Sequence, residues 1–356
     1  MFETLAAAGL SEPALMALVG LAGGIALGLA ARIGRFCTLG AIEDLIYGGS
    51  DIRMRMWALA VGVAVTCTFA MAGLGWVRPE ATFYVAQGWN PLAHVAGGVL
   101  FGWGMAVAGN CGYGALARLG GGDLRAFVIV LVMGVSAYVV LSGPLAALRV
   151  ALFPPDLVQG AIPAGFAWLG AAATGLPAHV VGLAIGLAGT AAALWPERMR
   201  RDRRAVLWGA VVGLAVASGW AGTSWVAQNG FEAVAVQSHT FARPLGDTLV
   251  WLMLASGLSA GFAVGSVTGV LVGAFLGSTI KGHFRWEACE DPRELRRQIG
   301  GAVAMGAGGA VALGCSVGQG LTAFSVLAYG APLTVACIWL GAWAGLRHLI
   351  HGFAPS

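Results

Sequence analysis

The sequence "AGNCGYGALARLGGGDLRA" (residues 108–126) lies between two apolar runs, each long enough to cross a membrane. It combines many glycines with a single thiol, that of Cys111, and it ends in charged residues. Backbone that is not helical is tolerated at membrane depth only where it is buried in protein or lines a cavity. A break of this kind predicts either close packing or a path through the interior, and the rest of the sequence decides between them.

Composition identifies the class of protein. The chain has 356 residues, of which 58% are apolar and only 10% are charged, whereas soluble domains carry roughly a quarter charged residues. The apolar runs are continuous rather than alternating, which favours membrane-spanning helices over a β-barrel. The 57 glycines fit this class, because small residues let membrane helices pack closely. We therefore expect an all-α integral membrane protein that forms a single transmembrane domain over residues 1–356.

Nine apolar runs are long enough to span a bilayer. They lie near residues 14–34, 55–77, 92–110, 124–148, 177–195, 205–221, 246–264, 298–314 and 331–350. A further run at 266–280 is interpreted as an extension of the seventh span. Glycine-rich apolar pieces that are too short to cross lie between some of the spans, and they predict four short intramembrane helices near residues 37–48, 112–121, 223–235 and 316–328.

The basic residues indicate the orientation in the membrane. With the N-terminus outside, 17 of the 20 basic residues fall in cytoplasmic segments, and only Arg78, Arg149 and Arg243 fall outside. Such an excess is the positive-inside pattern, and it predicts an outer N-terminus and a cytoplasmic C-terminus. Topology alone explains the basic residues, so nucleic acid is not an expected partner. Membrane lipid is an expected partner, because the chain has many apolar spans.

An internal repeat relates two halves of the chain, residues 14–148 and 205–350. The segment "GGVLFGWGMAVAGNCGYG" (97–114) aligns without gaps to "GAVAMGAGGAVALGCSVG" (301–318), which places Cys111 on Cys315. A weaker match aligns residues 28–38 with 213–223, with Gly222 in the position of Cys37. Each half contains four spans, and the single connecting span at 177–195 inverts the second half. Inverted repeats are typical of transport proteins whose site lies near the bilayer midplane.

The cysteines at the breaks form the candidate site. On this topology Cys37 and Cys111 enter from the cytoplasmic side and Cys315 from outside, so short pieces that dip inward bring the three thiols together. The short helices begin near these cysteines, where free N–H groups favour an anion. Asn110 and Ser316 suit the capping positions of such helix starts. A thiol is a weak donor and a soft contact, so the site suits a ligand that itself carries sulfur or another soft atom.

Three further residues complete the candidate binding and translocation site. Gly112 directly follows Cys111. Gln319, like Asn110, either donates to ligand oxygens or satisfies a helix end. Arg35 lies at the inner mouth, where it attracts an anion or only marks the topology. The six cysteines of the chain include no Cys-x-x-Cys pair and no metal-ligand spacing, so we expect no metal, no cofactor and no disulfide framework.

Three segments of the chain resemble the signature segments of the YeeE/YedE family: "GRFCTLGAIEDL" (34–45), "GMAVAGNCGYGALARLGGGDLRA" (104–126) and "ALGCSVGQGLTAFS" (312–325). The resemblance implies a bacterial inner-membrane protein that takes up thiosulfate or serves sulfur and selenium metabolism. It also implies four short helices in an inverted repeat. The essential cysteines of the family, which relay thiosulfate, map onto Cys37, Cys111 and Cys315. Some family members are coupled to a small TusA-like sulfur carrier, which we expect here as a separate cytoplasmic protein.

Uptake of intact thiosulfate through weak S–H contacts, without covalent chemistry or enzyme activity, is the leading hypothesis. One alternative is a conduit for another small solute, such as a sulfur or selenium compound. The other is a membrane redox enzyme, which needs a pair of nearby exchanging cysteines, whereas the three motif cysteines are separated by 74 and 204 residues. The chain contains no GxxxxGK[ST] sequence, which excludes ATP-driven transport by this polypeptide.

Overall fold

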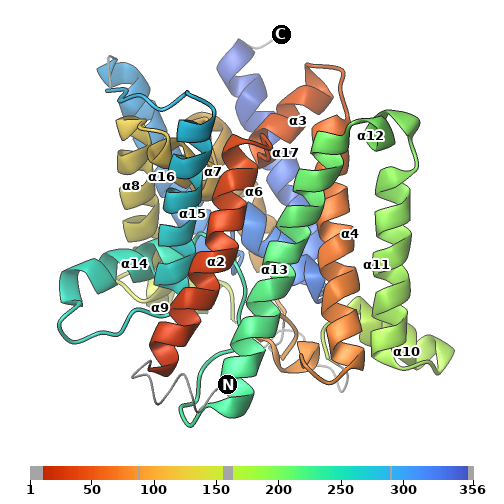
Figure 1. Cartoon of the computed structure of the whole chain (residues 1–356). Helices are drawn as coiled ribbons and strands as arrows, with labels where there is room; N and C mark the ends of the chain where they lie inside the picture. Colours follow the sequence, from red (N-terminus) through yellow and green to blue (C-terminus); the bar gives the residue numbers. More distant parts are fainter. Residues whose placement is uncertain (1–10, 87–88, 155–162, 289–290, 352–356) are drawn as a thin grey trace.

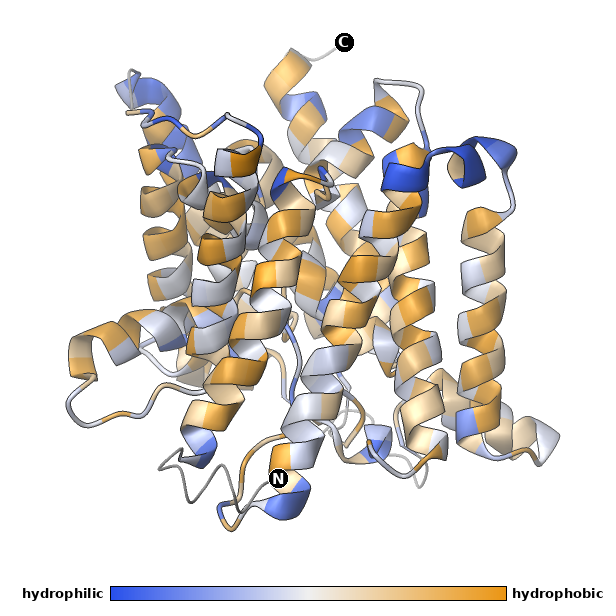
Figure 2. Ribbon diagram, viewed as in Figure 1, coloured by the Kyte–Doolittle hydropathy of each residue, from blue (hydrophilic) through white to orange (hydrophobic). Residues whose placement is uncertain are grey.

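The computed structural model describes residues 11–86, 89–154, 163–288 and 291–351. These residues form helices joined by loops, with no β-strand among them. The long helices stand side by side in one bundle (Figure 1). The bundle is mainly hydrophobic along its middle, and hydrophilic residues gather toward its ends (Figure 2). The protein is therefore an all-α, multi-pass membrane protein, as its composition predicts.

Long helices form the framework of the bundle. They are α2 (Glu12–Arg32), α4 (Ile52–Gly73), α6 (Pro91–Ala108), α8 (Leu124–Leu141), α11 (Ala178–Leu194), α13 (Arg203–Asn229), α15 (Phe262–Ile280), α16 (Pro292–Val311) and α17 (Gly330–His351). Seven segments of the described chain, which include all of these helices except α11 and α16, are long and apolar enough to cross a membrane.

The two remaining long helices differ from the others in composition or geometry. Helix α11 and α10 (Phe166–Thr174) form a pair bent by 115°, which makes an eighth crossing if the pair is one span. Helix α16 has 20 residues, but its first turns contain Arg293, Glu294, Arg296 and Arg297. The expected count of nine membrane spans therefore stays a prediction.

Shorter helices interrupt the framework. At the predicted breaks lie α3 (Thr38–Ile46), α7 (Gly112–Gly120) and the π-helix η2 (Gly318–Ala323), which is the middle of a helical run over residues 316–325. Near the bundle ends and in connecting segments lie η1 (Pro79–Ala81), α5 (Phe83–Ala86), α9 (Ala146–Leu152), α12 (Glu197–Arg201) and α14 (Arg243–Leu254). Three of the four short intramembrane helices predicted from glycine-rich pieces are thus found where they were expected.

The fourth predicted short helix, at residues 223–235, is wrong. Helix α13 continues to Asn229, because its last two turns contain no helix breaker before Gly230. The weak alignment that placed Gly222 in the position of Cys37 is wrong for the same reason, since residue 222 lies inside a continuous helix. By the order of elements, the counterpart of α3 in the second half is α14, which lies across the bundle (Figure 1).

The seventh predicted span, at residues 246–264, is also wrong. Helix α14 ends at Leu254, and α15 begins only at Phe262, after Gly261 at its N-cap. The crossing segment is therefore α15 itself rather than an extension of an earlier span. A hydropathy pattern that stays apolar from residue 246 to 280 does not reveal this break, because the loop residues are small and only weakly polar.

The crossing of α6 and α16 supports the inverted repeat. A Cβ atom on Gly97 would lie 2.7 Å from the carbonyl oxygen of Gly308, and one on Gly301 would lie 2.6 Å from that of Gly104. In the sequence alignment Gly97 and Gly104 correspond to Gly301 and Gly308, so exchanging the two halves exchanges these two contacts. A two-fold axis between α6 and α16 requires this relation. The halves at 14–148 and 205–350 stay a prediction, which this crossing supports.

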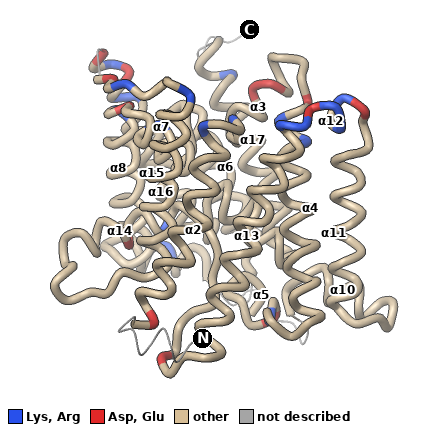
Figure 3. The backbone as a smooth tube through the Cα atoms, in the orientation of Figure 1, with Lys and Arg blue, Asp and Glu red and all other residues tan. Residues whose placement is uncertain are grey.

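Charge is distributed unevenly between the two ends of the bundle. Most Lys and Arg side chains gather at the end where α12 lies, and few lie at the opposite end (Figure 3). Helix α2 begins at the end with few basic residues and α17 finishes at the basic end (Figure 1). This arrangement agrees with the positive-inside pattern. The orientation with the N-terminus outside and the C-terminus in the cytoplasm is still a prediction.

Candidate translocation site

Three chain breaks share one local conformation. In each, a helix ends, one residue adopts a left-handed backbone, and a cysteine follows two positions later. The left-handed residues are Arg35 (φ 59°), Gly109 (φ 74°) and Leu313 (φ 57°). A left-handed residue is a common helix ending, but side chains other than that of glycine adopt it at a cost. The strained positions before Cys37 and Cys315 show that the surrounding structure holds these breaks in place.

Each cysteine caps the short helix that follows it. The thiol of Cys37 accepts a hydrogen bond from the Gly40 N–H (3.5 Å), and the thiol of Cys111 accepts one from the Gly114 N–H (3.4 Å). Cys315 accepts in the same way from the N–H three residues on, at 3.3 Å. The prediction that Asn110 and Ser316 cap these helices is therefore wrong. Each of them is instead a sequence neighbour of the cysteine that caps the helix. The sulfur atoms lie at the positive ends of three short helices.

A buried polar side chain stands next to each cysteine without a hydrogen-bond partner among the described residues. The unpartnered atoms are Thr38 Oγ1, Asn110 Nδ2 and Ser316 Oγ. Each residue is at most 5% exposed, and a buried donor without a partner costs about 1–3 kcal/mol. The Ser316 hydroxyl faces the Cys111 thiol but makes no hydrogen bond of acceptable geometry with it. Beside each of the three thiols, one buried polar group therefore has hydrogen-bonding capacity left for a ligand.

The structure brings the three cysteines close together. The rings of Phe36 and Tyr113, beside Cys37 and Cys111 in the sequence, lie 6.5 Å apart. Phe241, whose N–H donates to the Cys315 sulfur, also approaches Gly112, the neighbour of Cys111. Cys111 and Cys315 are fully buried, whereas Cys37 is partly exposed, and all three thiols are free. Residues that are far apart in the sequence thus converge through the two halves of the fold.

A cavity of about 380 Å³ reaches Cys37 from the basic end of the bundle. Arg35, the residue predicted for the inner mouth, lines it together with Asn110. Its lining also contains the acidic residue Glu43 and four other basic residues, Arg32, Arg53, Arg118 and Lys281. The Arg53 guanidinium pairs with Asp44 at 3.3 Å. The cavity therefore has an excess of positive charge next to the thiol, which favours an anion.

A second cavity, of about 210 Å³, approaches Cys315 from the opposite end and includes Thr240 and Gly314 in its lining. The Phe241 N–H donates to the Cys315 sulfur at 3.2 Å, and the Thr240 hydroxyl lies 3.8 Å from it. These contacts come from the extended segment between α13 and α14, where no candidate residue had been predicted. This segment therefore forms part of the site.

Aromatic side chains lie between the cavity at Cys37 and the cavity at Cys315. The Phe36 ring lies 6.5 Å from the Tyr113 ring, which lies 5.5 Å from the Phe241 ring. The Tyr113 hydroxyl donates to the Leu27 carbonyl at 2.6 Å, which fixes its ring. A Cβ atom on Gly112 would lie only 3.1 Å from the carbonyl oxygen of Phe241. These groups therefore fill the space between the two cavities, beside Cys111.

Gln319 has a structural role in this conformation. Its Nε2 donates to the carbonyls of Ala312 (2.8 Å) and Leu313 (3.3 Å), at the end of α16. Both amide hydrogens are therefore occupied, and the helix-end reading of this residue is the one that the structure supports. Besides Thr240 and Phe241, the sequence analysis missed Thr38. A Cys-x-x-Gly pattern, which occurs at all three breaks, is the sequence signal that would have drawn attention to it.

A bundle of membrane helices whose breaks meet at a buried polar site is an architecture typical of membrane transporters. A sequence model of the family described as "Sulphur transport" matches residues 33–344. The chain belongs to this family, the YeeE/YedE family to which its signature segments pointed.

Two curated relatives carry the name thiosulfate transporter TsuA. The chain is 25% identical over 352 residues to that of Spirochaeta thermophila, which covers 92% of this chain and 97% of the relative. It is 26% identical over 353 residues to that of Escherichia coli, which covers 95% of this chain and 92% of the relative.

Proposed function

We propose that this protein takes up thiosulfate across the bacterial inner membrane, along a path that runs from Cys315 through Cys111 to Cys37. The observation that carries the proposal is the trio of cysteine caps, each with an unpartnered buried donor beside it. Thiosulfate has a soft terminal sulfur and three hard oxygens. The thiols suit the sulfur atom and the neighbouring hydroxyl and amide groups suit the oxygens. The names of the two relatives support the choice of this anion.

The thiosulfate ion passes intact, and no S–S bond is made or broken. Conduction needs sites that bind an ion well enough to admit it and loosely enough to release it. Weak S–H contacts from three successive thiols meet this need, because each replaces part of the hydration shell without trapping the anion. The starts of the three short helices add favourable partial charge along the path.

Inward movement works against a negative-inside membrane potential. The cost is about 2.3 kcal/mol per charge at 100 mV, so a dianion faces about 4.6 kcal/mol. This is equivalent to a concentration gradient of more than about a thousandfold. Passive uptake therefore requires prompt consumption of thiosulfate in the cytoplasm, and a separate TusA-like sulfur carrier is the proposed partner. Its proposed docking surface is the charged segment at 281–298, which comprises the loop before α16 and the first turns of α16, and of which residues 289 and 290 lie outside the described chain.

Uptake of sulfur-35 thiosulfate into liposomes that contain the purified protein tests this function. We expect uptake above that of protein-free liposomes, with weak competition by sulfite and selenite. A preference for selenite over thiosulfate would favour the alternative conduit. Dependence of net uptake on a proton or sodium gradient would replace the passive mechanism by a coupled one, and absence of thiosulfate uptake would contradict the proposal.

A further inference from the structure

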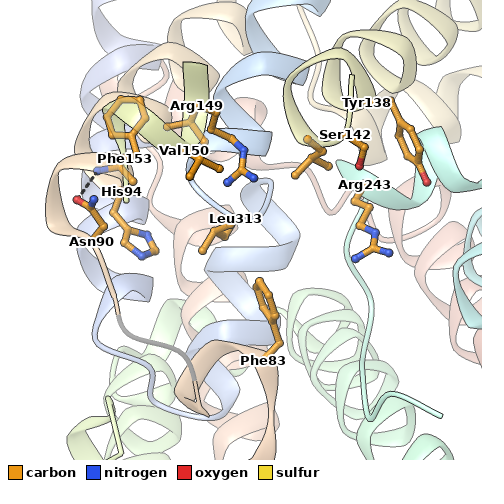
Figure 4. Close-up of a pocket in the computed structure, with 13 residues that line it drawn as sticks. Phe83, Asn90, His94, Tyr138, Ser142, Arg149, Val150, Phe153, Arg243 and Leu313 are labelled. Atoms are coloured by element: carbon orange, nitrogen blue, oxygen red, sulfur yellow. Dashed lines mark hydrogen bonds between the residues drawn. The ribbon is translucent and has the colours of Figure 1, made fainter. Parts of the chain in front are cut away.

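A cavity of about 390 Å³ opens at the outer end of the bundle (Figure 4). It lies between the start of α6, the α8–α9 connection, the start of α14 and the end of α16. It is separate from the inner cavity, and none of its lining residues was a candidate in the sequence. Its polar lining residues are Asn90, His94, Tyr138, Ser142, Arg149 and Arg243.

Most of the neutral polar groups in this cavity are already engaged. The Asn90 side chain caps α6 and donates to the Pro154 carbonyl at 3.0 Å. The Nδ1 atom of His94 lies 2.6 Å from the Thr334 hydroxyl. Neither side chain is therefore fully available to an incoming ligand. The groups that remain for a ligand are the Ser142 hydroxyl and the two guanidinium groups. In Figure 4 the Arg149 guanidinium lies near Leu313, and Arg243 lies near Ser142 and Tyr138.

The two arginines differ in whether a carboxylate pairs with the positive charge of the guanidinium group. Arg149 is half-buried, and its Nε donates to the Val140 carbonyl at 3.2 Å. No carboxylate pairs with it in the described part of the chain. Arg243 is mostly exposed and lies 3.4 Å from the Asp247 carboxylate, which also accepts from Tyr138. An uncompensated, partly buried charge attracts an anion more strongly than one that is already paired and solvated. Arg149 is therefore the stronger anchor.

The cavity is continuous with the approach to the first thiol. It shares Phe83, Leu141, Arg243 and Leu313 with the smaller cavity that reaches Thr240 and Gly314, beside Cys315. An anion held between the two arginines is therefore one step from the thiol path. The volume of about 390 Å³ corresponds to roughly 13 water molecules at about 30 Å³ each, which is room for a small dianion together with part of its hydration shell.

We propose that this outer cavity is a binding site for divalent oxyanions, anchored by Arg149 and assisted by Arg243. Its role as the first stage of uptake rests on the proposed function. The guanidinium groups recognise charge and oxygen atoms, which sulfate and thiosulfate share. They have no means of recognising the terminal sulfur. The protein then selects in two stages: the outer site admits both anions, and the thiols pass only thiosulfate. Sulfate is accordingly an inhibitor that binds but is not transported.

The test compares Arg149→Gln with Arg78→Gln in liposomes that contain the full-length protein. Arg78 is an exposed arginine of the same end of the bundle that does not line the cavity. We expect Arg149→Gln to raise the KM for thiosulfate and the Ki of sulfate by about tenfold each, as loss of a charge-assisted contact predicts. Arg78→Gln should leave both constants within about twofold of the wild-type values.

Two further variants test the proposal through the direction in which the Ki of sulfate changes, which a purely structural effect would not reproduce. Asp247→Asn releases Arg243 from its partner, so it should lower the Ki of sulfate, whereas Arg243→Gln should raise it by less than Arg149→Gln does. Sulfate that fails to inhibit, or that inhibits Arg149→Gln as strongly as the wild-type protein, would overturn the outer site.

A direct binding measurement separates this site from the proposed function. Sulfate binding to the purified protein, followed by its effect on thermal unfolding, does not depend on transport. Binding that is lost in Arg149→Gln while thiosulfate uptake is absent in all proteins would support the site and refute the function. Uptake with no sulfate effect on unfolding or on transport would refute the site and leave the function standing.

Discussion

Replacement of Ser316 by alanine should make the protein more stable and less active. The Ser316 hydroxyl is 2% exposed and has no hydrogen-bond partner in the described structure. Such a group costs about 1–3 kcal/mol, so its removal should raise the free energy of unfolding by about 1 kcal/mol. A donor retained at this cost in folding is explained if it binds the substrate. The measurement is reversible unfolding in mixed detergent micelles, with and without thiosulfate.

Ligand should reverse this order of stability. At a concentration of 100 times the Kd, thiosulfate stabilises the wild-type protein by about 2.7 kcal/mol. Loss of one hydrogen bond to a charged ligand weakens binding by about 10- to 100-fold, so Ser316→Ala should gain only about 0.4–1.4 kcal/mol at the same concentration. The wild-type protein is then the more stable of the two. A variant that is less stable without ligand, or that binds thiosulfate normally, would refute this reading of the unpartnered hydroxyl.

Glycine substitutions test the path and the helix crossing. Gly318→Ala should reduce thiosulfate uptake strongly, since the new Cβ atom would collide with the Thr240 hydroxyl beside Cys315; normal uptake by a folded variant would contradict this. Gly301→Ala should lower the yield of folded protein, because its Cβ atom would lie 2.5 Å from the Ala108 nitrogen. The matched control is Gly300→Ala, whose Cβ atom would have no other atom within 4 Å. This control should be neutral or slightly stabilising. Equal loss in the two variants, measured by size-exclusion chromatography, would argue against the close crossing of α6 and α16.

Much of the architecture follows from simple patterns in the sequence. Low charge and long apolar runs predict the helical bundle, and glycine-rich pieces predict α3, α7 and the helix around η2. The failures have a physical cause. Hydropathy measures how apolar a segment is, but it does not show where the backbone stops being helical. The break between α14 and α15 consists of small, weakly polar residues, so it is invisible to this measure.

The candidate site could be predicted only in part, because local sequence patterns do not report tertiary contacts. The three cysteines lie at three chain breaks, and Asn110 and Arg35 line the cavity at Cys37; the role of these residues in binding and translocation stays a prediction. The capping role was assigned to the wrong neighbours, because asparagine and serine are stronger N-cap residues than cysteine in general. The contacts of Thr240 and Phe241 with Cys315 depend on a tertiary approach of an extended segment, and no local pattern in the sequence encodes it.

The central claim is that soft thiol contacts carry thiosulfate along the path, and single Cys→Ser variants test it most directly. Serine keeps a hydroxyl donor but loses the polarisable sulfur. Sulfur-35 thiosulfate uptake should be measured in liposomes for Cys111→Ser and Cys315→Ser, with Cys67→Ala and Cys337→Ala, which lie within α4 and α17, as controls. We predict that uptake falls sharply in the two serine variants, at normal yield of folded protein, and stays near the wild-type rate in the controls. Unchanged uptake in both serine variants would contradict the account.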